Sequence, residues 1–357
     1  MASISAGHGT QSRTIYPSQS SSKPLAGAHV VPNSHVTPRP ALAARLGGCD
    51  EVEVTGLDNL LGVLDRRKNG HRDRGLLTVC NHVSVLDDPL IWGILPLRYA
   101  IDVENLRWGL GAHDICFKNR FTSAFFSYGQ VLPTHRLWHS PQGGLYQPTI
   151  AQAVKLLSSP SSVIKPSEMT FSTTGTDSFI SPSAYAANRH AWVHIFPEAC
   201  CHQSPDNSLR YFKWGVSRLI LESDPAPEFV PMFIHGTQDI MPEDRGFPRF
   251  LPRIGQRIRV MIGKPTDSES LFGHYRSAWK RLVEKSGDPD LLRHDPEAMQ
   301  LRVDVAKAVR DEIQKLRLSM GFAPEEDETA ALAETWSKEP NKRKFKSPVD
   351  GSLVNRH

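Results

Sequence analysis

Residues 76–89 read LLTVCNHVSVLDDP, and this stretch decides the fold. The uncharged run Leu76–Val79 predicts a short buried strand, and Asp88-Pro89 predicts the start of a helix. His82 and Asp87 therefore fall on the connection at the carboxyl end of a strand. In open α/β sheets, ligands bind and reactions take place at that edge. These residues alone leave open a surface loop in which Asn and Asp serve as turn formers and a helix cap.

Strand-like and helix-like segments alternate along the rest of the chain, which predicts one α/β domain. Strands are expected at EVEVTGL from Glu51, WVHIFPE (192–198), EFVPMFIHG from Glu228 and IRVMIGKP (258–265). Helices are expected from about Pro89, at Leu145–Leu157, at Ser208–Glu222, from about Ser270 and at Glu297–Met320.

Composition divides the chain into three parts. Residues 1–48 are rich in Ser, Pro, Ala and Thr and contain no Asp or Glu, which is typical of an organelle transit peptide or of a plain disordered tail. The folded domain is expected at 49–320. Within it, the Ser-, Thr- and Pro-rich residues 158–190 predict a mobile insertion. Residues 321–357, which include the basic cluster NKRKFK, predict a disordered tail.

Charge and hydropathy limit the partners. A net charge of +4 is too small to indicate nucleic acid, and it suits an anionic membrane surface. The most apolar stretch, VSVLDDPLIWGILPLRYAI (83–101), is interrupted by two aspartates and two prolines, whereas a span needs about 18 apolar residues. The sequence therefore predicts peripheral or monotopic membrane contact. Candidate contact segments are 89–99 and 120–128, with burial in the core as the alternative.

The five cysteines form no C-x-x-C pair, so reduced thiols are expected rather than a disulfide framework. Metal ligation by Cys200, Cys201 and His202 is disfavoured, because adjacent positions rarely converge on one ion. We expect neither a metal ion nor a cofactor.

His82 and Asp87 are the first candidates for chemistry. A neutral imidazole takes a proton from a hydroxyl near pH 7, and a carboxylate on its other nitrogen fixes the tautomer. The activated hydroxyl can belong to the substrate. Ser84 is an alternative nucleophile, but it lies in no G-x-S-x-G elbow, which favours a structural hydroxyl.

Three weaker candidates follow along the chain. Glu198, just past a strand, can orient a substrate hydroxyl or hold a basic residue, or be an ordinary strand-end carboxylate. The guanidinium of Arg136 suits phosphate. Arg210 and Lys213, three residues apart on the expected helix, share a face that meets lipid headgroups or water.

The order of four motifs carries a family resemblance. N-H-x-x-x-x-D (81–87), G-x-x-x-P-x-x-R (129–136), F-P-E (196–198) and V-P (230–231) resemble the glycerolipid acyltransferase family over residues 50–320. The strings LRWGLGAHDICF, FFSYGQV and RYFKWGVSRLILE are similar to one branch of that family, the mitochondrial phospholipid–lysophospholipid transacylases, and its fungal members in particular.

The resemblance implies a mixed sheet flanked by helices and CoA-independent acyl transfer between phospholipids and lysophospholipids, including cardiolipin remodelling. It implies a location on mitochondrial membranes that face the intermembrane space. His82 would be the general base and Asp87 its orienting carboxylate. The substrate-binding set would be Asn81, Ser84, Arg136, Glu198, Arg210 and Lys213.

The chain departs from the family pattern after F-P-E, where Ala199 replaces the usual glycine and Cys200-Cys201-His202 follow. Alanine tolerates positive φ poorly, so the loop on the phosphate side is expected to be altered. Two alternatives stay open: an acyltransferase that depends on acyl-CoA, and a catalytically weak lipid-binding homologue.

Overall fold

The computed structural model describes residues 51–68, 72–102, 105–137, 139–159, 168–248, 250–325, 328–333, 345–346 and 353–354. All of them belong to one compact unit, His35–His357. The predicted segment 1–48 lies outside the described residues, as does much of the predicted basic tail.

The main sheet has eight strands, which are β1 (Glu51–Thr55), β2 (Leu76–Cys80), β3 (Arg107–Ala112), β4 (Val131–Thr134), β7 (Trp192–Ile195), β8 (Glu228–His235), β9 (Arg257–Ile262) and β10 (Thr266–Asp267). Their order is β1-β9-β8-β2-β7-β3-β4, and β10 pairs with β8. β2 runs parallel to both β7 and β8, whereas β9 runs antiparallel to β8. The predicted mixed α/β sheet is confirmed.

β2 lies inside the sheet and is buried on both faces, which explains its unbroken uncharged sequence. Leu77 and Val79 pack into one hydrophobic core, and Leu76 and Cys80 pack into another on the opposite face. The loop that follows β2 is therefore anchored to the best-packed part of the sheet.

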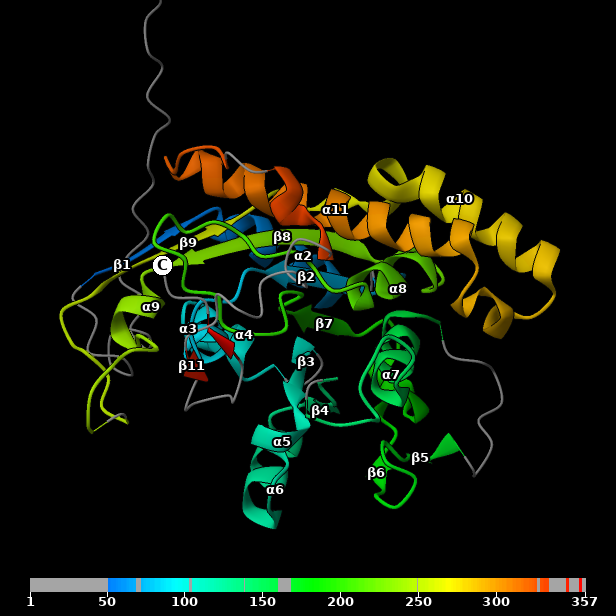
Figure 1. Cartoon of the computed structure of the whole chain (residues 1–357), viewed down its shortest axis with the longest axis horizontal. Coiled ribbons are helices and arrows are strands. Elements are labelled where there is room, and N and C mark those ends of the chain that lie inside the picture. The colour runs from blue at the N-terminus through cyan, green and yellow to red at the C-terminus, as the bar shows by residue number, and fades with distance from the viewer. Residues whose placement is uncertain are drawn as a thin grey trace, which may run out of the picture. The chain divides into compact units, whose positions relative to one another are not determined.

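Helices cover both faces of the sheet. They are α2 (Leu57–Lys68), α3 (Asp87–Gly93), α4 (Leu97–Ala100), α5 (His113–Cys116), α6 (Arg120–Tyr128), α7 (Pro148–Leu157), α8 (Gly215–Leu221), α9 (Thr237–Ile240), α10 (Ser268–Ser286) and α11 (Pro296–Ser319). Helices α7, α8, α10 and α11 share the core of Leu77 and Val79, whereas α2 and α3 share the core of Leu76 and Cys80. Figure 1 shows α11 lying along β8, with α10 packed beside α11.

The last long helix begins and ends close to the predicted bounds. The side chain of Asp295 accepts a hydrogen bond from Ala298 N at 2.8 Å and caps the helix, and Pro296 occupies its first position. Both features favour a helix start. The buried residues Val305, Val309 and Ile313 then follow the period that the sequence shows.

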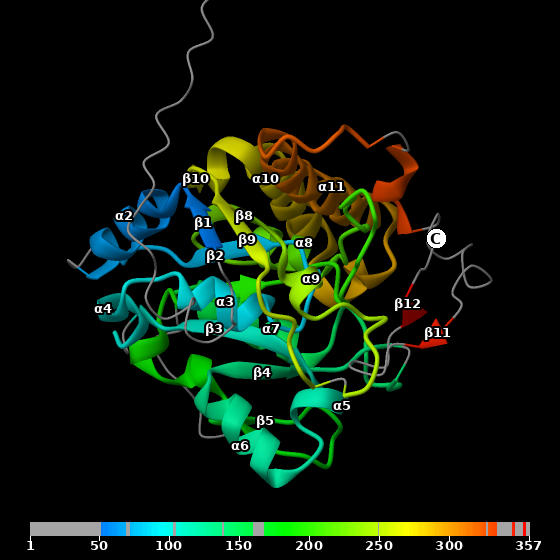
Figure 2. The same cartoon turned by 90° about the vertical axis from the view of Figure 1, so that its left-hand side faces the viewer.

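Strand β4 forms one edge of the sheet, and α6 lies beyond it (Figure 2). Its start is a capping box in which Asn119 accepts a hydrogen bond from Thr122 N at 3.0 Å. None of its side chains is buried. Among the residues that the structure describes, no helix is both long and apolar enough to cross a membrane.

The prediction of a helix over Ser208–Glu222 is wrong in extent, because only Gly215–Leu221 (α8) is helical there. The backbone N–H groups before it bond to distant partners instead of to the preceding turn. Leu209 N donates to Glu325 Oε1 at 2.7 Å, and Lys213 N donates to Pro197 O at 2.8 Å. Tertiary contacts therefore override the helical pattern of the sequence.

The basic run 66–74 begins inside helix α2, and its Arg67 is buried. α2 extends to Lys68, and the buried Arg67 donates to Arg74 O at 3.0 Å and to His190 O at 2.6 Å. Its guanidinium satisfies two loop carbonyls, which is why a charged residue can be buried at this place.

Of the region predicted as an insertion, residues 158–159 and 168–190 are described, and residues 160–167 lie outside the description. It contains β5 (Thr170–Phe171), β6 (Phe179–Ile180) and two short 3-10 helices at Pro182–Ala184 and Ala186–Asn188. In segment 89–99, whose placement the sequence leaves open, burial in the core holds for Leu90, Ile91, Ile94, Leu95 and Tyr99.

Candidate active site

His82 and Asp87 meet at the carboxyl end of β2. His82 Nδ1 lies 2.8 Å from Asp87 Oδ2. The His82 side chain is 22% exposed, whereas that of Asp87 is fully buried. A carboxylate bonded to Nδ1 selects the tautomer with the proton on Nδ1, which leaves Nε2 as the basic nitrogen. The structure thus brings the two residues into the arrangement that the loop sequence predicts.

The loop itself holds the Asp87 carboxylate in place. Val83 N and Ser84 N donate to Asp87 Oδ2 at 2.7 and 2.9 Å. Thr237 Oγ1 donates to Asp87 Oδ1 at 2.5 Å. These three donors hold the carboxyl group of Asp87 in place before substrate arrives. Thr237 follows β8. The sequence does not predict its contact with Asp87, because no local motif links the two residues.

Aromatic packing fixes the His82 ring as well. Phe196, from the F-P-E motif, stacks on it with ring centroids 4.5 Å apart and an interplanar angle of 26°. Cys201 Sγ lies 3.6 Å from His82 Nε2. The sequence analysis predicts no role for the Phe196 side chain. Its position directly after a strand is the signal that could have indicated this contact.

Glu198 is buried and joins the loop after β2 to the segment that precedes α8. Its Oε1 accepts from His82 N at 2.9 Å, and its Oε2 accepts from Arg210 N at 3.1 Å. Burial raises the pKa of Glu198 to about 7, against the opposing effect of these two donors. The carboxyl group therefore positions the His82 backbone in this structure.

Asn81 and Ser84, predicted in the substrate-binding set, are buried and engaged with backbone. Asn81 Nδ2 donates to Ile234 O at 3.0 Å, and its Oδ1 accepts from Ile234 N at 2.8 Å. Ser84 Oγ accepts from Leu86 N at 3.3 Å. Asn81 thus ties the end of β2 to β8, and Ser84 shapes the turn before α3.

Arg136 lies past β4 and is paired with a carboxylate. Its Nε donates to Asp114 Oδ1 at 3.2 Å, and its second guanidinium nitrogen contacts Oδ2 of the same residue. Burial alone would raise the pKa of Asp114, but the paired Arg136 lowers it overall. A phosphate that binds Arg136 would have to share the guanidinium with Asp114.

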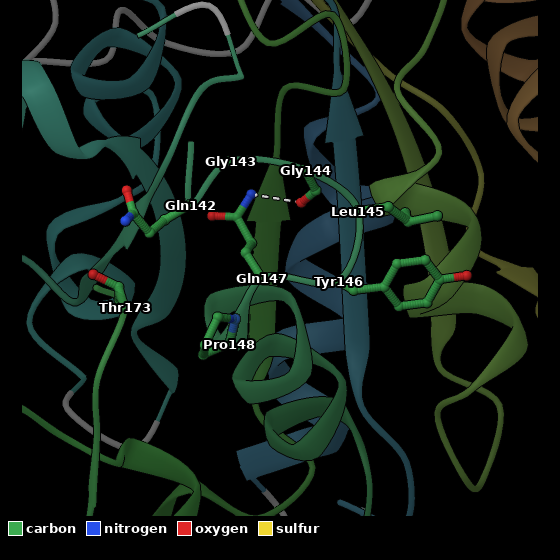
Figure 3. A pocket seen from close by; sticks show the side chains of 8 residues that line it. All are labelled: Gln142, Gly143, Gly144, Leu145, Tyr146, Gln147, Pro148 and Thr173. Carbon is green, nitrogen blue, oxygen red and sulfur yellow. Dashed lines mark hydrogen bonds between the residues drawn. The ribbon is translucent and has the colours of Figure 1, made fainter. Parts of the chain in front are cut away.

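The loop that carries Arg136 is held by Gln147. Gln147 Oε1 accepts from His135 N at 2.8 Å, and its Nε2 donates to Gly144 O at 2.8 Å, the bond drawn in Figure 3. Figure 3 shows the hollow between this loop and Thr173. Neither His82 nor Asp87 lines it.

Arg210 and Lys213 lie before α8 and not on one helix face, which corrects the sequence prediction. The guanidinium of Arg210 donates to Cys200 Sγ at 2.8 Å, and Lys213 Nζ lies 4.4 Å from the centroid of the Tyr211 ring. Both cations flank the Tyr211 ring, and Glu198 connects this segment to the loop that carries His82.

His113, His135 and Asp177 bring three potential metal-ligand atoms within 4.8 Å of one another. The two imidazole rings stack with centroids 4.3 Å apart and an interplanar angle of 21°. Nearly parallel rings direct their in-plane lone pairs side by side, whereas a tetrahedral site needs them to converge. His135 Nε2 also pairs with Thr173 Oγ1 at 2.7 Å.

A histidine base with a buried carboxylate partner at the carboxyl end of a strand can deprotonate a hydroxyl for acyl transfer. The chain belongs to the acyltransferase family, whose model matches residues 51–235, and it is an O-acyltransferase.

Within that family, the chain is 36% identical to tafazzin from Saccharomyces cerevisiae over 324 residues, which cover 86% of this chain and 82% of that protein. It is 29% identical to the taffazin of Dictyostelium discoideum over 74% of this chain and 79% of that protein. It is also 30% identical to N-acylphosphatidylethanolamine synthase from Arabidopsis thaliana, over 61% of this chain and 64% of that protein. The tafazzins are the branch to which the sequence motifs pointed, and that prediction is confirmed. These relatives support a phospholipid acyltransferase activity.

A solved structure, the 1-acyl-sn-glycerophosphate (LPA) acyltransferase PlsC from Thermotoga maritima, aligns with a TM-score of 0.39 and 16% identity, covering 75% of this chain and 72% of that chain.

Proposed function

We propose that this protein transfers acyl chains between phospholipids and lysophospholipids without CoA, and that cardiolipin is among its substrates. The observation that carries the proposal is the His82–Asp87 pair, with 2.8 Å between Nδ1 and Oδ2, in a chain similar to yeast tafazzin over 86% of its length. Such a reaction needs a base for the acceptor hydroxyl and a route by which both lipids reach it.

In this proposal His82 is the general base and Asp87 its orienting group. Nε2 removes the proton of the acceptor hydroxyl, and the oxygen attacks the carbonyl carbon of the donor ester. Asp87 stabilises the imidazolium that forms, and the imidazolium then protonates the departing lysophospholipid oxygen. Because one oxygen ester is broken and an equivalent one is formed while both lipids are bound, the reaction is reversible and needs no soluble acyl carrier.

The substrate-binding roles are proposals of the same kind. Arg136, Arg210 and Lys213 offer positive charge to phosphate groups. Glu198 acts through its hydrogen bonds to His82 N and Arg210 N, and couples headgroup binding to the position of the base. Asn81 and Ser84 support the loop from within.

Membrane contact is proposed first through α6. Its most exposed apolar side chains are Phe121, Phe125 and Tyr128, with exposed fractions of 90, 73 and 88%. Lys118 and Arg120, just before Phe121, supply positive charge for anionic headgroups. Exposed aromatic rings beside basic residues suit the interfacial region of a bilayer.

A second contact is proposed at the loop between α9 and β9. Phe247, Phe250 and Ile254 are exposed by 97, 75 and 75%. In both views, this loop and α6 extend away from α10 and α11 (Figures 1 and 2). Gln203 Nε2 donates to Val83 O at 2.8 Å and to Met241 O at 3.2 Å, which joins the catalytic loop to the chain that leads into this loop.

For location we propose mitochondrial membranes that face the intermembrane space, with peripheral or monotopic attachment. The similarity to tafazzins and the acid-free composition of residues 1–48 support this location.

The deciding experiment supplies liposomes that contain a labelled diacyl phospholipid and an unlabelled lysophospholipid, without CoA. We expect label transfer that falls by at least about 10²-fold in His82→Ala, the low end of what loss of a general base costs. His274→Ala, an exposed histidine on α10, is the matched control and should transfer at the wild-type rate. Transfer only after acyl-CoA is added would replace the proposal with the CoA-dependent alternative. Lipid binding without transfer under either condition would replace it with the lipid-binding homologue.

A further inference from the structure

Two buried arginines of α11 hold the backbone of the segment that precedes α8. Arg310 Nε donates to Arg210 O at 3.1 Å, and a terminal nitrogen of Arg310 donates to Leu209 O at 2.6 Å. Arg317, about two helical turns further along α11, donates to the carbonyl oxygens of residues 206 and 207 at 2.8 and 2.7 Å. The two guanidinium groups therefore satisfy four carbonyl groups of a segment that forms no helix of its own.

Glu325 holds the same segment from the chain that follows α11. Its Oε1 accepts from Leu209 N at 2.7 Å, and its Oε2 accepts from Arg310 at 2.6 Å. The side chains of Arg310 and Glu325 are 5 and 10% exposed, so salt screens their ion pair little. We call Arg310, Arg317 and Glu325 the clamp.

The chain between α11 and Glu325 is itself fixed. The Phe322 ring lies 5.0 Å from the His235 ring, and the guanidinium carbon of Arg317 lies 5.6 Å from the centroid of Phe322. Arg317 also donates to Ala323 O. Glu325 is therefore presented to Leu209 by packed chain, although more than a hundred residues separate the two in the sequence.

The segment that the clamp holds belongs to the candidate active site. Leu209 N points to Glu325, whereas the next amide, Arg210 N, donates to Glu198 Oε2 at 3.1 Å. Glu198 Oε1 in turn accepts from His82 N at 2.9 Å. The segment also carries Arg210, one of the cations proposed above to meet lipid phosphate.

His82 has supports that do not depend on the clamp. Asp87 Oδ2 lies 2.8 Å from its Nδ1, and His202 N donates to His82 O at 2.7 Å. Phe196 stacks on its ring. A change in the clamp should therefore disturb the cationic segment more than the base.

We infer that Arg310 and Glu325 are positioning residues for phosphate binding, which act by holding residues 209–210 so that Arg210 is pre-organised for the lipid; this rests on the function proposed above. Without the clamp, an incoming lipid must order the segment, and part of its binding free energy is consumed in doing so. Apparent affinity then falls by the fraction of molecules in which the segment is ordered. Once lipid is bound, the segment is ordered and His82 acts as before.

The experiment measures initial rates of acyl transfer in liposomes without CoA, at varied mole fractions of lysophospholipid acceptor. Glu325→Ala should raise KM by about tenfold, the order of one hydrogen bond to a charged group, and leave kcat close to that of the wild type. Glu325→Gln keeps an oxygen for Leu209 N and should recover part of the KM.

Glu269→Ala is the matched control. Glu269 Oε1 accepts from Arg276 Nε at 3.0 Å, and the buried Arg276 also donates to Ser223 O at 2.9 Å, past the far end of α8. Like Glu325→Ala, this variant removes a carboxylate from a buried arginine that keeps its carbonyl partners. Its KM should equal that of the wild type, whatever the change in melting temperature.

A second comparison tests the route through Arg210. In the Arg210→Gln background, Glu325→Ala should raise KM little further, because the residue that the clamp positions is already gone. An unchanged KM in Glu325→Ala, an equal rise in Glu269→Ala, a fall in kcat alone, or a full tenfold rise in the Arg210→Gln background would each overturn the inference and leave the proposed function standing. Absence of transfer by the wild-type protein would instead overturn the proposed function.

Discussion

Replacement of Asp87 by asparagine isolates the charge of the catalytic carboxylate from its geometry. Val83 N and Ser84 N both point at Oδ2, so the amide oxygen of the new side chain is held at that position and still accepts from His82 Nδ1. The amide nitrogen then faces Thr237 Oγ1, whose hydroxyl can turn to accept instead of donate. The tautomer and the hydrogen-bond count are kept, and only the negative charge is lost.

The magnitude follows from that charge. Opposite unit charges about 4 Å apart attract by about 4 kcal/mol at an effective dielectric constant near 20. This stabilisation of the imidazolium corresponds to a loss of about 10³-fold in rate. Asp87→Ala should lose the same charge and should also lower the stability of the fold. It leaves two loop N–H groups without an acceptor, at about 1–3 kcal/mol each if they stay dry.

Initial rates of label transfer between liposomal lipids measure the first effect, and thermal unfolding measures the second. Asp58→Asn, at an exposed position of α2, controls for loss of a negative charge elsewhere. A rate for Asp87→Asn within tenfold of wild type would refute the role of the charge. A melting temperature that falls as far in Asp87→Asn as in Asp87→Ala would refute the claim that geometry is kept.

Three further outcomes can be measured. Because burial raises the pKa of Glu198 from its ordinary 4.5 to about 7, the folded chain holds a proton that the unfolded chain releases between these values. Stability should therefore fall as pH rises through that window, by about 3 kcal/mol, and Glu198→Gln should lack this component in urea unfolding at pH 5 and pH 8. Phe125→Asp should lose flotation with anionic liposomes at an unchanged melting temperature, whereas Ile91→Asp, in the core, should fail to fold; equal flotation of Phe125→Asp and wild type would contradict the α6 contact. Ala199→Gly should relieve the left-handed backbone and raise the free energy of unfolding by up to about 1 kcal/mol, and a loss of stability there would show that the turn is not strained.

The sequence predicted the parts of this fold whose local pattern and tertiary surroundings agree. The uncharged run before His82 became a central strand because burial on both faces demands such a run. The helix at residues 296–319 has a cap, a proline at its first position and a consistent apolar face. The helix expected from Ser208 failed because partners far along the chain, Glu325 and Pro197, capture its early N–H groups.

The candidate site likewise contains residues that the sequence predicts and residues that only the fold brings together. His82 and Asp87 share one loop, so their spacing alone predicted that they pair. Thr237 and Cys201 reach the pair from other strands, and only the order of strands in the sheet brings them there. Arg136 was found by its motif, but its partner Asp114 precedes it by more than twenty residues, and no pattern connects the two.

The separation between the central strand and the edge of the sheet bears on how this enzyme can diversify. His82 and Asp87 directly follow β2, whereas the exposed aromatic helix α6 lies beyond β4, and β7 and β3 separate β2 from β4 in the sheet. Mutations that remodel α6 leave the bonds around His82 untouched. Natural selection can therefore retune which surface the protein visits, and how long it stays, while the machinery for moving an acyl chain is inherited unchanged.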